Sequence, residues 1–336
     1  MRVNKILIVL GEPQSTFSEI LLKYFYSKEF SKNKKKIILI GSKSLLQKHL
    51  KILKINLKFK FRIINHLKEA NVREVNIINI NYNNKKKFSK ISSNSSKYIT
   101  NCFNLALSLI RNNEKTALIN GPISKKHFLK KKYLGITEYI SKKIKSKNQV
   151  MLIYNDKLAV TPLTTHLPIK YVSKEIKKKK IIKNVIEIRK FYINFLNKKP
   201  KIAILGLNPH CETIDKFSEE KKIIIPAINY LKKNNTNISG PFPADTFFLK
   251  KNIIKYDVVV GMYHDQVLTP FKTLFKFDAI NITLGLKYLR VSPDHGIASD
   301  LIFKKKANPS SLISCIKFIE RYSKWFLPKN PLGKTS

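Results

Sequence analysis

Three histidines stand in equivalent places along the chain. Each lies just beyond an apolar segment with the length of a buried strand and beside turn-forming residues: His166, His210 and His264. Neutral imidazoles suit a borderline divalent ion such as Zn²⁺, and three protein ligands leave positions open for a substrate. A lone histidine is more often structural than a ligand. The spacing alone therefore favours neither of two interpretations, a shared metal site or three unrelated histidines.

A metal ion at such a site would have a definite chemical use. Coordination lowers the pKa of a substrate hydroxyl and stabilises the alkoxide from which hydride leaves. It also stabilises the enolate that forms when a β-keto acid loses CO₂. The histidines are therefore consistent with oxidation of an alcohol, with decarboxylation as a second step.

A second group of polar residues lies towards the C-terminus: Lys272, Asn281, Arg290, Asp294, His295 and Gly296. Arg290 stands out because only seven of the 66 basic residues are Arg. The planar guanidinium grips a carboxylate or a phosphate through parallel hydrogen bonds. An ordinary surface ion pair is the alternative interpretation of this residue.

Asp245 lies in a rigid, polar-tipped turn at 240–246 (GPFPADT). Its carboxylate suits a general base or a neighbour of a metal ligand. A helix N-cap is the usual role of an Asp in such a turn, and this third interpretation stays open.

The elements that must position these residues follow two patterns. Short apolar segments predict buried strands at about 6–10, 37–40, 75–80, 117–119, 150–154, 158–162, 202–205, 258–261 and 280–284. Helical periodicity predicts helices at about 16–26, 98–110, 137–146, 180–196, 219–232 and 310–326, and residues 81–97 are expected to form a loop. The alternation predicts an α/β fold with a largely parallel sheet.

The length of 336 residues and the hydrophobic content of 43% allow two α/β lobes, each with its own core. Ligands of such sheets bind beyond the carboxyl ends of the strands, which is where the histidines lie. We therefore expect an active-site cleft between the lobes.

The formal net charge of +45 is the most extreme feature of the composition. Lys supplies most of it in runs spread along the chain, which is typical of solvated faces and argues against nucleic acid as the main partner. The field should attract anionic substrates. We expect no membrane span and no signal peptide, and the three scattered cysteines indicate a reducing, cytoplasmic location.

The sequence contains no G-x-G-x-x-G fingerprint and no phosphate-binding P-loop. A nicotinamide cofactor would therefore be held by a loop other than that of a standard Rossmann domain.

Six motifs resemble the 4-hydroxythreonine-4-phosphate dehydrogenase family, in its order and at close to its spacing. They are TTHLP at 164–168, GLNPH at 206–210, GPFPADT at 240–246, MYHDQ at 262–266, NITLGL at 281–286 and DHG at 294–296. GEP at 11–13 and GPI at 121–123 extend the resemblance to nearly the whole chain.

The resemblance implies an isocitrate/isopropylmalate dehydrogenase-like fold of two α/β/α lobes. The first lobe would comprise residues 1–125 plus about 286–336, and the second about 126–285. It implies a homodimer with a shared active site and one divalent cation (Zn, Mg or Co) per site, bound by His166, His210 and His264.

The resemblance also implies roles for the remaining candidates. Substrate contacts would come from Thr137, Lys272, Asn281 and Arg290. NAD or NADP would lie against Asp294, His295 and Gly296. Asp245 or Lys272 would transfer the proton.

The reaction that the resemblance implies belongs to vitamin B6 (pyridoxal/pyridoxine 5′-phosphate) biosynthesis. It oxidises the hydroxyl of 4-phosphooxy-L-threonine, a small phosphorylated hydroxy-amino acid. The resulting β-keto acid decarboxylates to 3-amino-2-oxopropyl phosphate.

The sequence departs from the family pattern mainly in its loops. The family's GEPAGIGPE reads GEPQSTFSE at 11–19, and its GPxHK reads GPISK at 121–125, with Ser124 in place of the histidine. Ile136 replaces a substrate-contacting histidine, and the glycine-rich AGEGG becomes CETID at 211–215. These differences bear on substrate specificity more than on reaction class.

Two other functions stay open. A related dehydrogenase of 4-phospho-threonate-type acids or dihydrodiols fits the loss of the histidine at 136. A degenerate, non-catalytic homologue that binds polyanions fits the basic surface. The complete histidine set favours an enzyme over the second of these.

Overall fold

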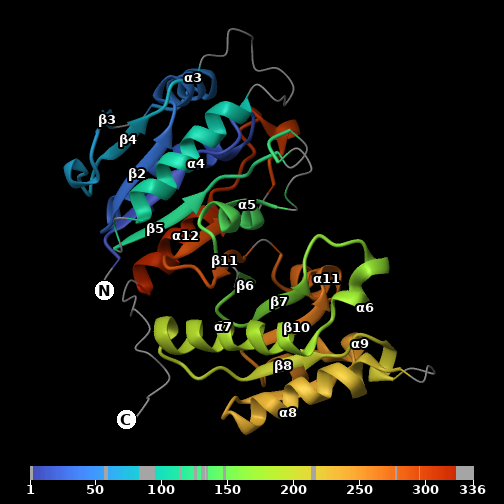
Figure 1. The fold of residues 1–336 in the computed structure, drawn as a ribbon. Helices are drawn as coiled ribbons and strands as arrows, with labels where there is room; N and C mark the ends of the chain where they lie inside the picture. Colours follow the sequence, from blue (N-terminus) through green and yellow to red (C-terminus); the bar gives the residue numbers. More distant parts are fainter. Residues whose placement is uncertain are drawn as a thin grey trace, which may run out of the picture. The chain divides into compact units, whose positions relative to one another are not determined.

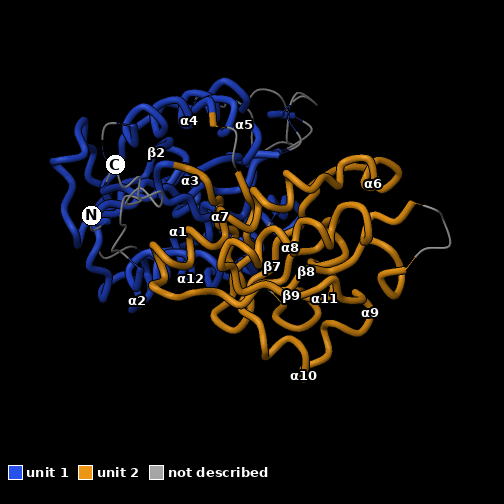
Figure 2. The backbone as a smooth tube through the Cα atoms, turned by 60° about the horizontal axis from the view of Figure 1, so that its bottom comes forward, with its two compact units in different colours: residues 1–145, 287–324 blue, residues 146–286, 325–336 orange. Residues whose placement is uncertain are grey.

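The computed structural model of the protein describes residues 3–56, 60–82, 95–111, 113, 115–124, 127–129, 133, 135–146, 149–212, 217–276, 278–294 and 296–322. The chain divides into two compact units (Figure 2). Unit 1 is formed by residues 1–145 and 287–324, and unit 2 by residues 146–286 within the described part.

In unit 1 the strands lie in the order β3-β4-β2-β1-β5-β12, and each of these neighbouring pairs runs parallel. Their bounds are β1 Lys5–Val9, β2 Lys36–Gly41, β3 Phe61–Ile63, β4 Val75–Asn79, β5 Thr116–Asn120 and β12 Arg290–Pro293. The central strands β1, β2 and β5 are almost continuously apolar and buried. Such a pattern is expected of parallel strands that are covered on both faces.

The helices of unit 1 are α1 Phe17–Tyr26, α2 Lys28–Lys32, α3 Lys43–Leu53, α4 Ser96–Arg111, α5 Ile136–Lys143 and α12 Ser310–Arg321, with 3₁₀ turns at Leu67–Glu69 and Ser299–Leu301. α4 packs on β1, β2 and β5, while α1 packs on α3 and α12 (Figure 1). α4 buries residues at intervals of three and four from Tyr98 to Ile110, so one apolar stripe faces the sheet.

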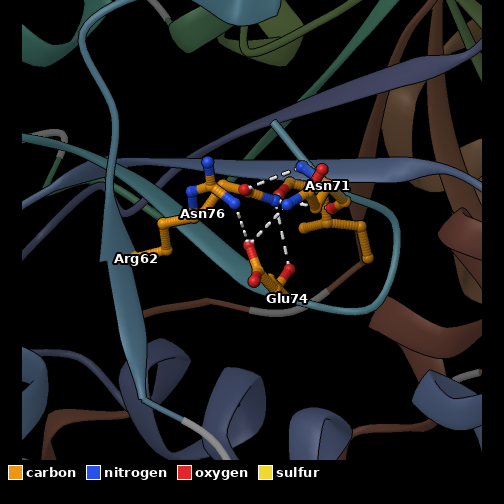
Figure 3. A network of polar contacts seen from close by, with 5 residues as sticks. Arg62, Asn71, Glu74 and Asn76 are labelled. Carbon is orange, nitrogen blue, oxygen red and sulfur yellow. Dashed lines mark hydrogen bonds and ion pairs between the residues drawn. The ribbon is translucent and has the colours of Figure 1, made fainter. Parts of the chain in front are cut away.

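A polar network around the buried Asn76 lies at the edge of the sheet in unit 1 (Figure 3). Asn76 on β4 is fully buried, and its Nδ2 donates to the carbonyl oxygens of Ile37 and Asn71 at 3.0 and 2.8 Å. Its Oδ1 accepts from the Asn71 N–H at 3.0 Å, and Glu74 beside it accepts from Arg62 on β3 at 2.8 Å. The network satisfies the buried amide and joins β2, β3 and β4.

In unit 2 the strands lie in the order β11-β6-β7-β10-β8-β9. Their bounds are β6 Val150–Tyr154, β7 Ala159–Thr164, β8 Ile202–Leu205, β9 Ile238–Phe242, β10 Val258–Tyr263 and β11 Ile280–Leu284. β6 is antiparallel to both of its neighbours, whereas β7, β10, β8 and β9 run parallel. The carboxyl ends of these four strands therefore meet at one edge.

The helices of unit 2 are α6 Val172–Glu175, α7 Lys178–Leu196, α8 Ile225–Lys233, α9 Ala244–Phe247, α10 Lys250–Ile253 and α11 His264–Phe275, with a π-helical turn at Glu220–Ile224 and 3₁₀ turns at Ile169–Tyr171 and Pro209–Cys211. One core lies where Val267 and Phe271 of α11 pack on Val160 and Val259 of the sheet. Each such side chain contributes about 1.5–3 kcal/mol by leaving water. Among the described helices of both units, none has the length and apolarity needed to cross a bilayer.

The structure confirms every predicted strand and places a helix in every predicted helical segment, although α12 is described only to Arg321. The elements that were not predicted are β3, β9, β12, α2, α3, α6, α9, α10 and α11. β9 contains Gly and Pro, and α11 contains Pro270, which are residues that normally signal a loop. β3, α2, α6, α9 and α10 are each only three to five residues long, too short for a periodic pattern. Within the expected loop at 81–97, α4 begins at Ser96, and residues 83–94 lie outside the described part.

The first unit extends further along the chain than the boundary expected near residue 125, because it includes α5. Tyr139 on α5 packs edge-on against Phe103 and Phe128. Arg111 Nη2 donates to the Lys143 carbonyl at 3.0 Å. Because these contacts join α5 to unit 1, the first boundary lies after residue 145. The second boundary, expected near 286, lies between residues 286 and 287.

Candidate active-site residues

Two of the three predicted metal ligands come together at adjacent strand ends in unit 2. His166 follows β7 and His264 is the first residue after β10, which pairs with β7 in parallel register. Their ring centroids are 5.8 Å apart, with an angle of 37° between the planes. A tetrahedral ion with metal–nitrogen bonds of about 2.0–2.1 Å holds two imidazole rings at about 5 Å. The pair therefore fits two ligand positions of one divalent cation.

One buried hydrogen bond joins the ends of β7 and β10 next to these histidines, and a second, exposed contact orients the His264 ring. Thr164, at the end of β7, donates its hydroxyl to the Met262 carbonyl at 2.8 Å. His264 Nδ1 lies 2.8 Å from Asp265 Oδ1. With the proton on Nδ1, the ring donates to this carboxylate and leaves Nε2 to face a ligand, which is the usual arrangement of a metal-binding histidine.

The third histidine follows β8, on the other side of β10. His210 lies in the 3₁₀ turn Pro209–Cys211, and its Nδ1 is 4.0 Å from Asp245 Oδ2. Both side chains are largely exposed. Across the residues that the structure describes, no group of three or more His, Cys, Asp or Glu side chains is placed to hold a metal ion. A single chain thus pairs His166 with His264 and pairs His210 with Asp245.

Two of the histidines share an uncommon backbone conformation. His166 has φ 52° and His210 has φ 54°, in the left-handed region that non-glycine residues seldom occupy. Such residues cluster at active sites and ligand clamps, where the surrounding structure holds them in place.

The N-cap interpretation of Asp245 is wrong. Pro243 occupies the N-cap position of α9, and Asp245 lies in the first turn of the helix. Its Oδ2 lies 4.0 Å from His210 Nδ1, so its place fits a proton acceptor or a neighbour of a metal ligand.

Lys272 and Asn281 lie elsewhere in unit 2. Lys272 is exposed on α11, eight residues beyond His264 and therefore about 12 Å further along the helix axis. Asn281 lies on β11 opposite Ile153, and its buried Oδ1 has no hydrogen-bond partner among the described residues. Most buried polar atoms are satisfied, so this oxygen is a candidate for contact with a ligand.

In unit 1 the structure brings Arg290 and Thr137 together. Arg290 is completely buried at the start of β12, and its Nη1 donates to Thr137 Oγ1 at 3.0 Å. Its Nε and Nη2 both donate to Asn120 Oδ1, at 3.0 and 2.8 Å. Burial lowers the pKa of Arg290 to about 10, so the group is still a cation at neutral pH. The alternative of a surface ion pair is wrong.

The predicted cofactor loop meets the start of α1. Asp294 donates its N–H to Ser311 Oγ at 3.0 Å, and the Ile297 carbonyl accepts from the Thr16 N–H at 3.1 Å. Gly296 leaves open space where a Cβ would be, since nothing lies within 4 Å of that position. His295 lies outside the described residues. The loop after β12 and the loop after β1 thus lie side by side in one unit.

Several buried polar residues that hold these loops were not predicted from the sequence. Asn120 orients Arg290, and its only sequence signal is a polar residue at the end of an apolar strand. Gln266 links two strand ends, since its Oε1 accepts from the Met262 N–H at 2.7 Å and its Nε2 donates to the Gly206 carbonyl at 2.8 Å. Glu12 accepts from Ser95 Oγ at 3.0 Å beneath the loop after β1. Burial raises the pKa of Glu12 against the opposing effect of that hydrogen bond.

The family model of the pyridoxal phosphate biosynthetic protein PdxA matches residues 33–319. The chain belongs to this family. A 4-hydroxythreonine-4-phosphate dehydrogenase from Sulfurihydrogenibium sp. (strain YO3AOP1) is 36% identical over 318 residues, 93% of this chain and 96% of the relative. A D-threonate 4-phosphate dehydrogenase from Salmonella typhimurium is 30% identical over 325 residues, 94% of this chain and 98% of the relative.

Solved structures agree with the family and with the predicted fold class. A 4-hydroxythreonine-4-phosphate dehydrogenase from Klebsiella pneumoniae has a TM-score of 0.81 and 26% identity, and the match covers 95% of this chain and 99% of that one. An isocitrate dehydrogenase from Methylococcus capsulatus has a TM-score of 0.51 at 11% identity, covering 95% and 85%. The second likeness concerns the fold alone and confirms the isocitrate dehydrogenase-like class.

Proposed function

We propose that this PdxA-family protein is a metal-dependent, NAD(P)-linked dehydrogenase of 4-phosphooxy-L-threonine in vitamin B6 biosynthesis. The observation that carries the proposal is the pairing of His166 with His264 at the ends of adjacent parallel strands. Family membership and the relative that is 36% identical over 93% of the chain support the choice of substrate. The product of oxidation is a β-keto acid, which loses CO₂ to give 3-amino-2-oxopropyl phosphate.

His166 and His264 would hold a divalent cation (Zn, Mg or Co), with His210 as the third ligand. When bound, the cation lowers the pKa of the substrate hydroxyl and stabilises the negative charge that develops on its oxygen. Asp265 orients the His264 ring through Nδ1, which keeps Nε2 directed at the site.

The anionic groups of the substrate need a fixed positive charge. Arg290 supplies it, because the guanidinium stays charged at neutral pH and is locked in place by Asn120. Thr137, Lys272 and Asn281 complete the substrate contacts in our proposal. The hydrogen bond from Arg290 orients the Thr137 hydroxyl.

Oxidation removes a hydride and a proton from the substrate carbinol. Asp294, His295 and Gly296 would hold NAD or NADP, whose nicotinamide would supply the hydride acceptor. The proton of the hydroxyl passes to Asp245, beside His210, or to Lys272. The position of Asp245 next to a predicted metal ligand favours it as the acceptor.

Turnover of 4-phosphooxy-L-threonine, measured as NADH or NADPH formation, tests the proposal. EDTA should abolish turnover and added Co²⁺ should restore it. His210→Ala should abolish turnover without unfolding the protein, whereas His66→Ala, at an exposed residue of unit 1, should leave turnover unchanged. Near-normal activity of His210→Ala would contradict the assigned role.

A second candidate substrate is 4-phospho-D-threonate, because a relative with that activity in its name is 30% identical over 94% of the chain. Ile136, at the start of α5, also fits a changed substrate, since the family histidine at this position is lost. Comparison of kcat/KM for the two phosphorylated acids distinguishes them. A preference for the acid that lacks the amine would overturn the vitamin B6 assignment.

We also propose that the enzyme is a cytoplasmic homodimer with a shared active site. The proposal of a dimer rests on membership of the family, for which the sequence motifs imply an active site shared between two chains. Sedimentation equilibrium tests the dimer, and a monomer with full activity would overturn it.

A further inference from the structure

A buried carboxylate holds the backbone that leads into His210. Glu220 Oε1 accepts hydrogen bonds from the N–H groups of Leu207 and Asn208, at 2.8 and 2.9 Å. Its Oε2 accepts from Asn208 Nδ2 at 3.0 Å and from Ser218 Oγ at 3.1 Å. Four hydrogen-bond donors therefore converge on the carboxylate of Glu220, and this residue is only 1% exposed.

The carboxylate is ionised at neutral pH. Burial by itself raises the pKa of Glu220, but the hydrogen bonds from Asn208 and Leu207 outweigh burial and hold the pKa below its ordinary value. Only the ionised group accepts through both oxygens from all four donors, since a carboxylic acid or an amide turns one side into a donor.

The backbone around Glu220 leaves space for its side chain. Glu220 is the first residue of the π-helical turn Glu220–Ile224, a rare conformation that is frequent at functional sites. A Cβ on Gly206 would lie 3.2 Å from Glu220 Oε1 and 2.6 Å from Cys211 Sγ. Glycine at this position therefore leaves the room that the carboxylate occupies.

His210 depends on this backbone for its position. Its ring is 76% exposed, and its φ of 54° lies in the left-handed region. Pro209 has no N–H, so Leu207 and Asn208 carry the last N–H groups before His210. Glu220 binds both of them.

We propose that Glu220 is a positioning residue for His210. Its carboxylate fixes the 206–209 backbone and thereby holds His210 in the conformation from which the imidazole serves as a metal ligand. The inference rests on the proposed function, because that function gives His210 its ligand role. Glu220 itself does not touch the metal or the substrate.

Titration of the metal-free protein with Co²⁺, followed by its visible absorption, tests this role without any turnover. Glu220→Gln keeps the size of the side chain but loses an acceptor oxygen. We expect it to raise the Co²⁺ dissociation constant about 10–100-fold, as loss of a group that orients a ligand does. Glu219→Gln is the matched control, because among the described residues Glu219 accepts a hydrogen bond from Asn208 Nδ2, at 3.0 Å, and from no backbone N–H of the loop. It should change the constant less than about twofold.

Ser218→Ala removes a single hydrogen bond to the carboxylate and keeps the inference testable if Glu220→Gln does not fold. It should weaken Co²⁺ binding in the same direction and by less. An unchanged dissociation constant in the folded Glu220 variant, or in Ser218→Ala where only that variant folds, would overturn the inference and leave the proposed function intact. Equal weakening by Glu219→Gln would also overturn it. Absence of Co²⁺ binding in the unsubstituted protein would overturn the proposed function and this inference together.

Discussion

Replacing Asn120 by Leu should destabilise the protein strongly, although the two side chains are similar in size. Asn120 Oδ1 accepts two hydrogen bonds from the fully buried Arg290 guanidinium, at 3.0 and 2.8 Å. A hydrogen bond to a charged group contributes about 1.5–3 kcal/mol. Asn120→Leu removes two such bonds, so we expect its free energy of unfolding to fall by about 3–6 kcal/mol.

Equilibrium unfolding in urea at pH 7 measures this loss, since the guanidinium with a pKa of about 10 is charged there. Asn120→Asp is the matched control. It keeps an acceptor oxygen for Arg290 and adds a negative charge beside the guanidinium, but it loses the hydrogen bond from Asn120 Nδ2 to the Gly121 carbonyl at 3.0 Å. Its free energy of unfolding should therefore fall by less than that of Asn120→Leu.

The two variants separate the structural role of Asn120 from its effect on substrate binding. Because Asn120 is neutral, it holds Arg290 without cancelling its charge. Asn120→Asp should therefore raise the KM for a phosphorylated substrate at a smaller cost in stability than Asn120→Leu. If the free energy of unfolding of Asn120→Leu lies within about 0.5 kcal/mol of that of the unsubstituted protein, as for most surface substitutions, the reasoning about the buried charge is refuted.

Two further predictions concern pH. Burial of His49 on α3 lowers its pKa from 6.5 to about 4. The neutral imidazole therefore stabilises the fold fully above pH 6.5, and this stabilisation is lost as the pH falls through 4. His49→Leu should flatten the pH dependence of the unfolding free energy in that window by up to about 3 kcal/mol, and an unchanged pH dependence would refute this. Burial raises the pKa of Glu12 above 4.5, against the hydrogen bonds from Ser95 and Gln14, so stability is complete below 4.5 and declines as the pH rises through the raised pKa. Glu12→Gln should raise the Tm at pH 7 and leave it unchanged near pH 4, and a lower Tm at pH 7 would contradict this.

The positions of the histidines illustrate what local pattern predicts. Apolar segments bounded by turns identify β7, β8 and β10 correctly, and each histidine follows its strand as expected. The pattern does not give the order of the strands in the sheet. That order puts β10 between β7 and β8, which pairs His264 with His166 and leaves His210 beside Asp245.

Arg290 shows that the tertiary surroundings of a residue cannot be predicted from its neighbours in the sequence. Its apolar neighbours Leu289 and Val291 are compatible with a strand, yet β12 was missed because it begins with Arg and ends with Pro293. The partner Asn120 lies 170 residues away in sequence. Complete burial and the carboxamide acceptor therefore appear only when β5 and β12 pair.

The sequence alone determined the α/β class, most of the elements and the residues that end the strands, because side-chain periodicity and turn chemistry are properties of a few consecutive residues. Tertiary structure alone decided which strand ends are neighbours, that Arg290 is buried against Asn120, and that Glu220 and Gln266 hold the histidine loops. Those arrangements depend on hydrogen bonds and burial between segments far apart in the chain, where the cost of a buried polar group selects one partner among many.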